Sequence, residues 1–181
     1  MRIFAEHALM PQGWQGNVAV TISGGRIVGI DMNTQAVHSD VRVAALLPAL
    51  SNLHSHTFQR GMAGMTEVRG ASRDSFWTWR EVMYRFIDHL TPSQIEAIAA
   101  MAFVEMQETG FAAVAEFHYV HHQPGGARYD NLAELSERIF SAAATTGVGL
   151  THLPVLYAYG GAREAALGGG QLRFGNDADS Y

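Results

Sequence analysis

The chain has no cysteine and no lysine among its 181 residues. Without cysteine it can form no disulfide, hold no metal through a thiolate and use no cysteine nucleophile. Without lysine it supplies no phosphate-loop lysine, no Schiff base and no carbamylated lysine that bridges two metals. Chemistry must therefore come from other polar side chains. Nine histidines against no cysteine favour a metal site built from imidazole and carboxylate ligands.

Charge and long apolar runs are also scarce. Charged residues make up 16% of the chain, and its net charge is −5. Such a chain presents no basic face to phosphates, so we expect no nucleic-acid partner. The first residues lack the pattern of a signal peptide, and the longest apolar run, 43–50, contains Pro48 and is far too short to span a bilayer. A cytoplasmic protein without membrane contact is therefore the expectation.

Residues 1–46 are predicted to form a small β-rich domain. Strands are expected over residues 17–22 and 26–31, with Gly24-Gly25 between them as a two-residue hairpin turn. A third short strand is expected over residues 41–47. Period-two patterns bounded by glycine thus account for most of this region.

Residues 47–181 are predicted to alternate strands with helices. The expected strands cover 49–56, 111–120 and 148–159; the expected helices start at the caps Asp74-Ser75, Thr91-Pro92-Ser93-Gln94 and Asn131 with Glu134, and the last two end at Gly110 and Gly147. The apolar faces of these last two helices recur at an offset of 37 residues: Ile95, Ile98, Ala102, Phe103 and Met106, then Leu132, Leu135, Ile139, Phe140 and Ala143.

Long crossovers between successive strands predict a parallel sheet, either doubly wound or part of a (β/α)8 barrel. Three parallel strands cannot close a barrel, and residues 176–181 have the composition of a helix start. We therefore expect the chain to be the N-terminal piece of a longer protein.

His54-Ser55-His56 is the first candidate site, at the predicted C-terminal end of a buried strand. Side chains two residues apart on a strand share a face, so both imidazoles project together and form half of a zinc-type site. Spacing alone is equally compatible with two hydrogen-bonded structural histidines. His121 and His122 are adjacent and face opposite ways on a strand, so they cannot chelate one metal together, and we expect one hydrogen-bonded histidine and one exposed histidine in a loop.

The strand over 111–120 has two alternative active faces, because Glu116 and His118 share one and Phe117 and Tyr119 share the other. The aromatic block 76–79 is expected to pack in the core. Arg80, in a chain with few charges, is expected to be aimed at a carboxylate.

These residues resemble a known family. The segment 47–56 is similar to the first-strand metal motif of the amidohydrolase superfamily, with Asn52 where many members have Asp. The blocks 57–60, 74–80, 84–86 and 116–122 together resemble the formimidoylglutamate deiminases, enzymes of histidine degradation. The resemblance runs over essentially the whole chain.

The resemblance implies the N-terminal part of a (β/α)8 amidohydrolase barrel over residues 47–181, preceded by a β-rich domain that C-terminal strands complete. It implies hydrolysis of N-formimino-L-glutamate to N-formyl-L-glutamate and ammonia with one divalent metal ion, usually zinc, although such sites also accept iron or manganese. His54 and His56 match metal ligands, and Gln59, Arg80 and Tyr119 match positions that contact the substrate.

The same resemblance places the catalytic residues and the remaining metal ligands beyond residue 181, so this piece alone is expected to be inactive. A small molecule is the expected partner, and a homodimer of the full-length protein is left open. Two alternatives remain: a deaminase of the same superfamily that acts on a guanine- or cytosine-like ring, and a non-catalytic remnant.

Overall fold

The computed structural model describes residues 1–67 and 75–181 and divides the chain into two compact units, Met1–Ala49 and Leu50–Tyr181. The domain boundary that we expected after residue 46 lies close to this division and remains a proposal for the longer protein.

The first unit is a four-stranded sheet in the order β3-β2-β1-β4. Its strands are β1 (Arg2–Met10), β2 (Gly13–Ser23), β3 (Arg26–Asp31) and β4 (Val41–Leu46). β1 pairs antiparallel with β2 and parallel with β4. Gly24 and Gly25 turn the predicted hairpin with φ of 56° and 73°, the left-handed region that a type I′ turn requires at both positions.

The second unit contains a parallel sheet in the order β5-β6-β7, as the long crossovers predicted. Its strands are β5 (Leu50–Ser55), β6 (Phe111–His118) and β7 (Gly149–Pro154). β7 ends five residues before Tyr159, where we expected its end, because the chain turns away and Tyr157 pairs with Gly175 instead. The sequence did not indicate this early end, because residues 148–159 form an apolar run without an alternating pattern.

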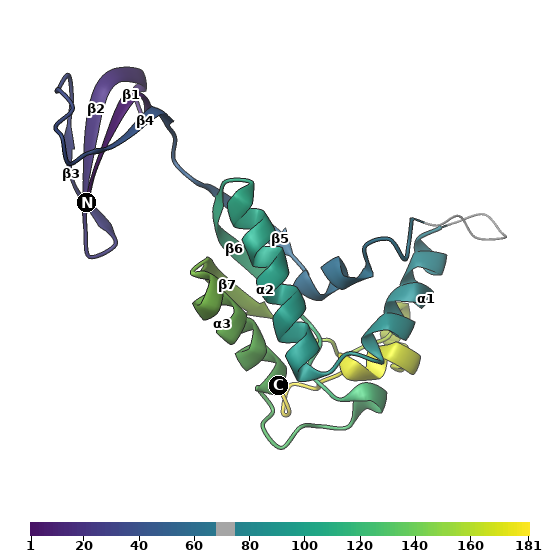
Figure 1. Cartoon of the computed structure of the whole chain (residues 1–181). Coiled ribbons are helices and arrows are strands. Elements are labelled where there is room, and N and C mark those ends of the chain that lie inside the picture. The colour runs from purple at the N-terminus through teal and green to yellow at the C-terminus, as the bar shows by residue number, and fades with distance from the viewer. Residues whose placement is uncertain (68–74) are drawn as a thin grey trace. The chain divides into compact units, whose positions relative to one another are not determined.

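Three helices accompany this sheet: α1 (Phe76–Ile87), α2 (Pro92–Glu108) and α3 (Glu134–Thr146). α2 and α3 lie side by side along the sheet (Figure 1). Thr91 and Gln94 form the predicted capping box of α2. Ser75 caps α1 with Thr78 as its reciprocal partner, whereas Asp74, the other expected cap residue, lies outside the described residues.

The start of α3 differs from the prediction. The side chain of Asn131 accepts a hydrogen bond from the Ala133 N–H, so it stabilises a turn before the helix rather than its cap. Leu132 therefore lies outside α3 and is 55% exposed, and Phe140, on the expected apolar face, is 49% exposed. Leu135 and Ile139 are buried as expected, so the correspondence at 37 residues is structural only in part.

The core of the second unit fills the space between the sheet and the helices. Its most deeply buried members include Ile87, Ile95, Phe103, Val114, Leu135 and Ile139. Short 3-10 segments join the elements: η1 (Thr57–Met62), η2 (Pro124–Gly126), η3 (Ala162–Glu164) and η4 (Gly169–Arg173). No helix in the described parts of the chain is long and apolar enough to cross a membrane.

Arg173 of η4 is fully buried and closes the C-terminal end of α1. Its guanidinium donates to the carbonyls of Ile87, Leu90 and His122. A cation suits this position because helix C-terminal carbonyls are unpaired and carry partial negative charge. Residues 177–180 form a turn, in which the Ser180 N–H donates to the Asp177 carboxylate, where we expected the start of a helix.

Candidate metal and substrate site

His54 and His56 converge at the end of β5. Their Nε2 atoms lie 3.0 Å apart, and the side chain between them, Ser55, is buried on the other side of the strand. Two imidazole nitrogens bound to one tetrahedral zinc at about 2.0–2.1 Å lie roughly 3.3 Å apart. The observed spacing therefore suits two ligands of one ion, as the His-x-His spacing predicted.

The ring of His56 is held in the orientation that a ligand needs. Its Nδ1 lies 2.8 Å from the carbonyl oxygen of Phe117, so Nδ1 carries the proton and Nε2 keeps its lone pair. Burial lowers the pKa of His56, which favours the neutral, metal-binding form. The ring of His54 stacks on that of Phe117 with centroids 4.4 Å apart. The donor set thus fits a divalent metal.

The metal shell is incomplete within the described residues. In residues 1–67 and 75–181 no group of three or more His, Asp or Glu side chains is arranged to hold a metal ion. Structural and catalytic zinc sites use at least three protein ligands. His54 and His56 would therefore need further ligands to complete such a site.

Gln59, Arg80 and Tyr119 lie around one cavity of about 480 Å³, which His56 also lines. Gln59 Nε2 donates to the Tyr119 hydroxyl at 2.8 Å. Burial raises the pKa of Tyr119 to about 12, so this hydroxyl stays protonated at neutral pH. The structure thus gathers residues from η1, α1 and the segment after β6 beside the His54–His56 pair.

Gly61 allows η1, which carries Gln59, to pack closely in this region. A Cβ on Gly61 would lie 2.7 Å from the Phe86 ring of α1 and 2.8 Å from the Ile98 side chain of α2. A side chain at this position would require the Phe86 ring and the end of the Ile98 side chain to move.

Arg80 is held by two tyrosine hydroxyls that the sequence interpretation did not include. Its Nε donates to the Tyr84 hydroxyl at 2.5 Å, and its Nη2 donates to the Tyr157 hydroxyl at 3.4 Å. Both tyrosines and Phe174 line the same cavity. The position of Tyr84, four residues after Arg80 on one helix, was a signal that sequence could have given; Tyr157 and Phe174 had none.

The aromatic block was expected to pack in the core, and for two of its members this is wrong. Phe76 and Trp77 are exposed in the first turn of α1. Arg80 lies 5.8 Å from the centre of the Trp77 ring, a cation–π distance. Phe76 and Trp79 both line the cavity.

Glu116 lies on the buried face of β6 and Phe117 lies on the other face, as the alternation predicted; which face serves the site stays a prediction. Glu116 is 1% exposed, and its Oε1 accepts two hydrogen bonds from Thr57, from the backbone N–H at 2.7 Å and from the hydroxyl at 2.8 Å. Its Oε2 is buried and has no hydrogen-bond partner in the described parts of the chain. Burial raises the pKa of this carboxyl group.

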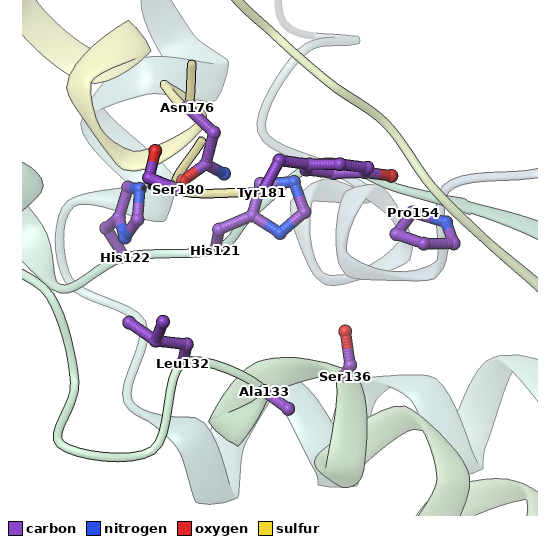
Figure 2. Close-up of a pocket in the computed structure, with 9 residues that line it drawn as sticks. All are labelled: His121, His122, Leu132, Ala133, Ser136, Pro154, Asn176, Ser180 and Tyr181. Carbon is purple, nitrogen blue, oxygen red and sulfur yellow. Dashed lines mark hydrogen bonds between the residues drawn. The ribbon is translucent and has the colours of Figure 1, made fainter. Parts of the chain in front are cut away.

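His121 and His122 lie at a second cavity of about 230 Å³, where they face Ser136 of α3 and Ala133, the residue just before that helix (Figure 2). Backbone carbonyls hold both rings: His121 Nε2 lies 3.0 Å from the Val155 oxygen and His122 Nε2 lies 2.7 Å from the Gly175 oxygen. Both histidines are buried, so the expectation that one of them would be exposed in a loop is wrong.

Comparisons with known proteins give three similarities. The family model described as formimidoylglutamate deiminase HutF, N-terminal domain, matches residues 1–44. The formimidoylglutamate deiminase of Pseudomonas aeruginosa is 50% identical over 180 residues, which are 99% of this chain and 40% of that protein. A crystal structure of an amidohydrolase from Brucella melitensis matches with a TM-score of 0.95 and 49% identity over 99% of this chain and 40% of that one.

A more distant structure shares the fold alone. An atrazine chlorohydrolase from Arthrobacter aurescens, complexed with zinc and atraton, matches with a TM-score of 0.61 and 19% identity, over 83% of this chain and 35% of that one. The chain thus spans about two fifths of the length of the Pseudomonas and Brucella proteins. The described fold is the N-terminal part of an amidohydrolase barrel with its preceding β-rich unit.

Proposed function

Because the chain corresponds in sequence and fold to the N-terminal portion of the formimidoylglutamate deiminases, we propose that its protein hydrolyses N-formimino-L-glutamate to N-formyl-L-glutamate and ammonia. The observation that carries this proposal is the convergence of five side chains. His54 and His56 lie within hydrogen-bond distance of each other, and Gln59, Arg80 and Tyr119 share a cavity with His56.

The metal in this proposal is one divalent ion, with zinc as the first candidate. His54 and His56 would hold it through Nε2, and the other ligands and the proton-transferring residues would lie beyond residue 181. When bound, the ion supplies Lewis-acid activation of the water that attacks the amidine carbon. The Phe117 carbonyl keeps the lone pair of His56 directed at the ion.

Arg80, Tyr119 and Gln59 would have different roles in binding the substrate. Arg80 would bind a carboxylate of the substrate, because its charge is permanent and its planar fork fits two oxygens. Tyr119 stays protonated and would donate a hydrogen bond, while Gln59 fixes the orientation of the Tyr119 hydroxyl. Together they would fix the acidic end of the substrate while the amidine reaches the metal.

The proposed setting is the cytoplasm, with a small dicarboxylate as the partner and neither nucleic acid nor membrane. The net charge of −5 supports the second part of this proposal, since it offers no basic surface to polyphosphates or anionic lipids. Electrostatic attraction for the substrate must then be local, at Arg80.

The test uses the full-length protein, with ammonia release and N-formyl-L-glutamate measured from the same reaction. His54→Ala and His56→Ala should each abolish activity and lower the bound metal, whereas His38→Ala, at an exposed histidine of the first unit, should change neither. Deamination of guanine or cytosine without hydrolysis of the amidine would replace this proposal with the ring deaminase. Loss of neither metal nor activity in the two alanine variants would refute the site.

A further inference from the structure

The buried carboxylate of Glu116 lies on the other side of the sheet from the His54–His56 pair. Glu116 has its side chain in the layer between the sheet and the helices, on the same face of β6 as Val114, a core residue. Its Oε1 accepts both hydrogen bonds of Thr57, the residue that directly follows His56. Burying a carboxyl group is costly unless its hydrogen bonds do specific work.

The backbone pairing between β5 and β6 is irregular close to these hydrogen bonds. The register between β5 and β6 is irregular between Asn52 and Ser55, the stretch that carries His54. His56 lies past the last paired residue of β5 and has φ −134° and ψ 80° at the start of η1. Strand pairing with β6 therefore fixes Ser55, between the two imidazoles, but not His54 or His56 themselves.

Hydrogen bonds to Glu116 take the place of strand pairing at the end of β5. By holding both the N–H and the hydroxyl of Thr57, Glu116 fixes the point where β5 ends and η1 begins. The next residue of β6, Phe117, holds the His56 ring through its carbonyl. Two successive residues of β6 thus fix the backbone and the ring of one short segment.

We propose that Glu116, through its two hydrogen bonds to Thr57, is a positioning residue that holds the His54–His56 pair at metal-binding spacing. This inference rests on the proposed function, because it takes the pair as metal ligands. Metal sites require their ligands to stay within about 0.5 Å of the binding geometry, which an unpaired strand end does not guarantee.

The experiment measures zinc affinity of the full-length protein by competition with a chromophoric chelator. Thr57→Val keeps the shape of the side chain but loses the hydroxyl donor, and Glu116→Leu removes the acceptor of both bonds. Loss of a residue that supports metal ligands typically weakens binding about 10- to 100-fold, and we expect this range for Glu116→Leu and a smaller loss for Thr57→Val. Thr57→Ser and Glu116→Gln keep the hydrogen bonds and should stay near wild type.

Two further measurements separate positioning from general stability. Thr146→Val is the matched control, because its hydroxyl also donates within the protein, to the Ala142 and Ala143 carbonyls of α3, far along the chain from the site. It should lower thermal stability without changing zinc affinity. The absorption spectrum of the cobalt-substituted protein should change in Thr57→Val and Glu116→Leu but not in Thr146→Val, since it reports ligand geometry.

The outcomes distinguish this inference from the proposed function. If the wild-type protein binds zinc and hydrolyses the substrate, but Glu116→Leu and Thr57→Val bind zinc as tightly as wild type, the positioning role alone is refuted. If Glu116→Leu does not fold, the comparison of Thr57→Val with Thr57→Ser decides the same question. Wild-type protein that holds no metal would overturn the proposed function, and this inference with it.

Discussion

Replacing Arg80 tests the proposed substrate most directly. In the structure its guanidinium lies 5.2 Å from the centre of the Tyr84 ring and donates to the Tyr84 and Tyr157 hydroxyls. These contacts fix the fork before substrate arrives, so little side-chain freedom remains to be lost on binding. Arg80→Ala removes both the charge and the fork, whereas Arg80→Lys keeps the charge alone.

The expected loss of activity follows from the substrate carboxylate, which loses its charged partner when Arg80 is replaced. Removing one member of a buried, hydrogen-bonded charge pair costs about 2–5 kcal/mol, because the other charge stays without a partner. This corresponds to a loss in kcat/KM of roughly 30-fold to several thousand-fold for Arg80→Ala. Arg80→Lys should lie between that variant and wild type, since lysine cannot reproduce two parallel hydrogen bonds.

The assay compares kcat/KM on N-formimino-L-glutamate with kcat/KM on an amidine that lacks the glutamate carboxylates, using the full-length protein. Arg80→Ala should lose activity on the first compound and little on the second. Arg85→Ala is the control, because Arg85 is exposed and lies on the same helix. Equal losses on both compounds would show that Arg80 supports the fold, and the substrate assignment would lose its main physical support.

Three further results are expected. Tyr119→Phe removes one neutral hydroxyl and should lower kcat/KM by about 0.5–1.5 kcal/mol, or roughly 2- to 13-fold; unchanged kinetics would contradict its role. Arg173→Leu leaves three buried carbonyls without their charged donor and should lower the free energy of unfolding by at least about 3 kcal/mol, measured with urea against an Arg163→Leu control. Burial, with the neighbouring His152 and His121, holds the pKa of His118 well below its usual value. Below pH ~6.5 this histidine therefore binds a proton in the unfolded chain but not in the folded chain. The free energy of unfolding should then fall with pH, by up to ~1.4 kcal/mol per pH unit for this histidine. An unfolding free energy that stays constant from about pH 7.5 to 5.5 would contradict this.

Local chemistry explains which parts of the fold could be predicted. Thr91 and Gln94 form the capping box that their spacing indicated, and Gly147 ends α3 in the left-handed conformation expected of a terminal glycine. Gly24-Gly25 turns the hairpin for the same reason. In each case the deciding interaction lies within four residues, so the sequence contains it.

Burial and element ends were predicted less well because they depend on distant partners. Phe103 is fully buried on α2, but Phe140, its equivalent 37 residues later, is half exposed. The two positions share a helical face pattern and differ in what packs against them. The early end of β7 depends likewise on the pairing of Tyr157 with Gly175.

In the site, too, local features could be predicted and contacts between distant residues could not. Strand geometry alone predicted that His54 and His56 share a face, and scarcity of charge drew attention to Arg80. The roles of Gln59 and Tyr119 came only from resemblance to a family. Glu116 and Thr57 are 59 residues apart, so no local pattern could indicate their hydrogen bonds.

The central place of β1 in the first sheet has a consequence for synthesis of the chain. β1 and β2 can form their hairpin once residue 23 has emerged, but β1 must wait for its second neighbour, β4, which ends at residue 46. At about 5–20 residues per second, that wait lasts roughly 1–5 s. During this interval the free edge of β1 can pair with another nascent chain. The length of chain between the end of β2 and the end of β4 therefore sets how long the nascent protein is open to misassembly.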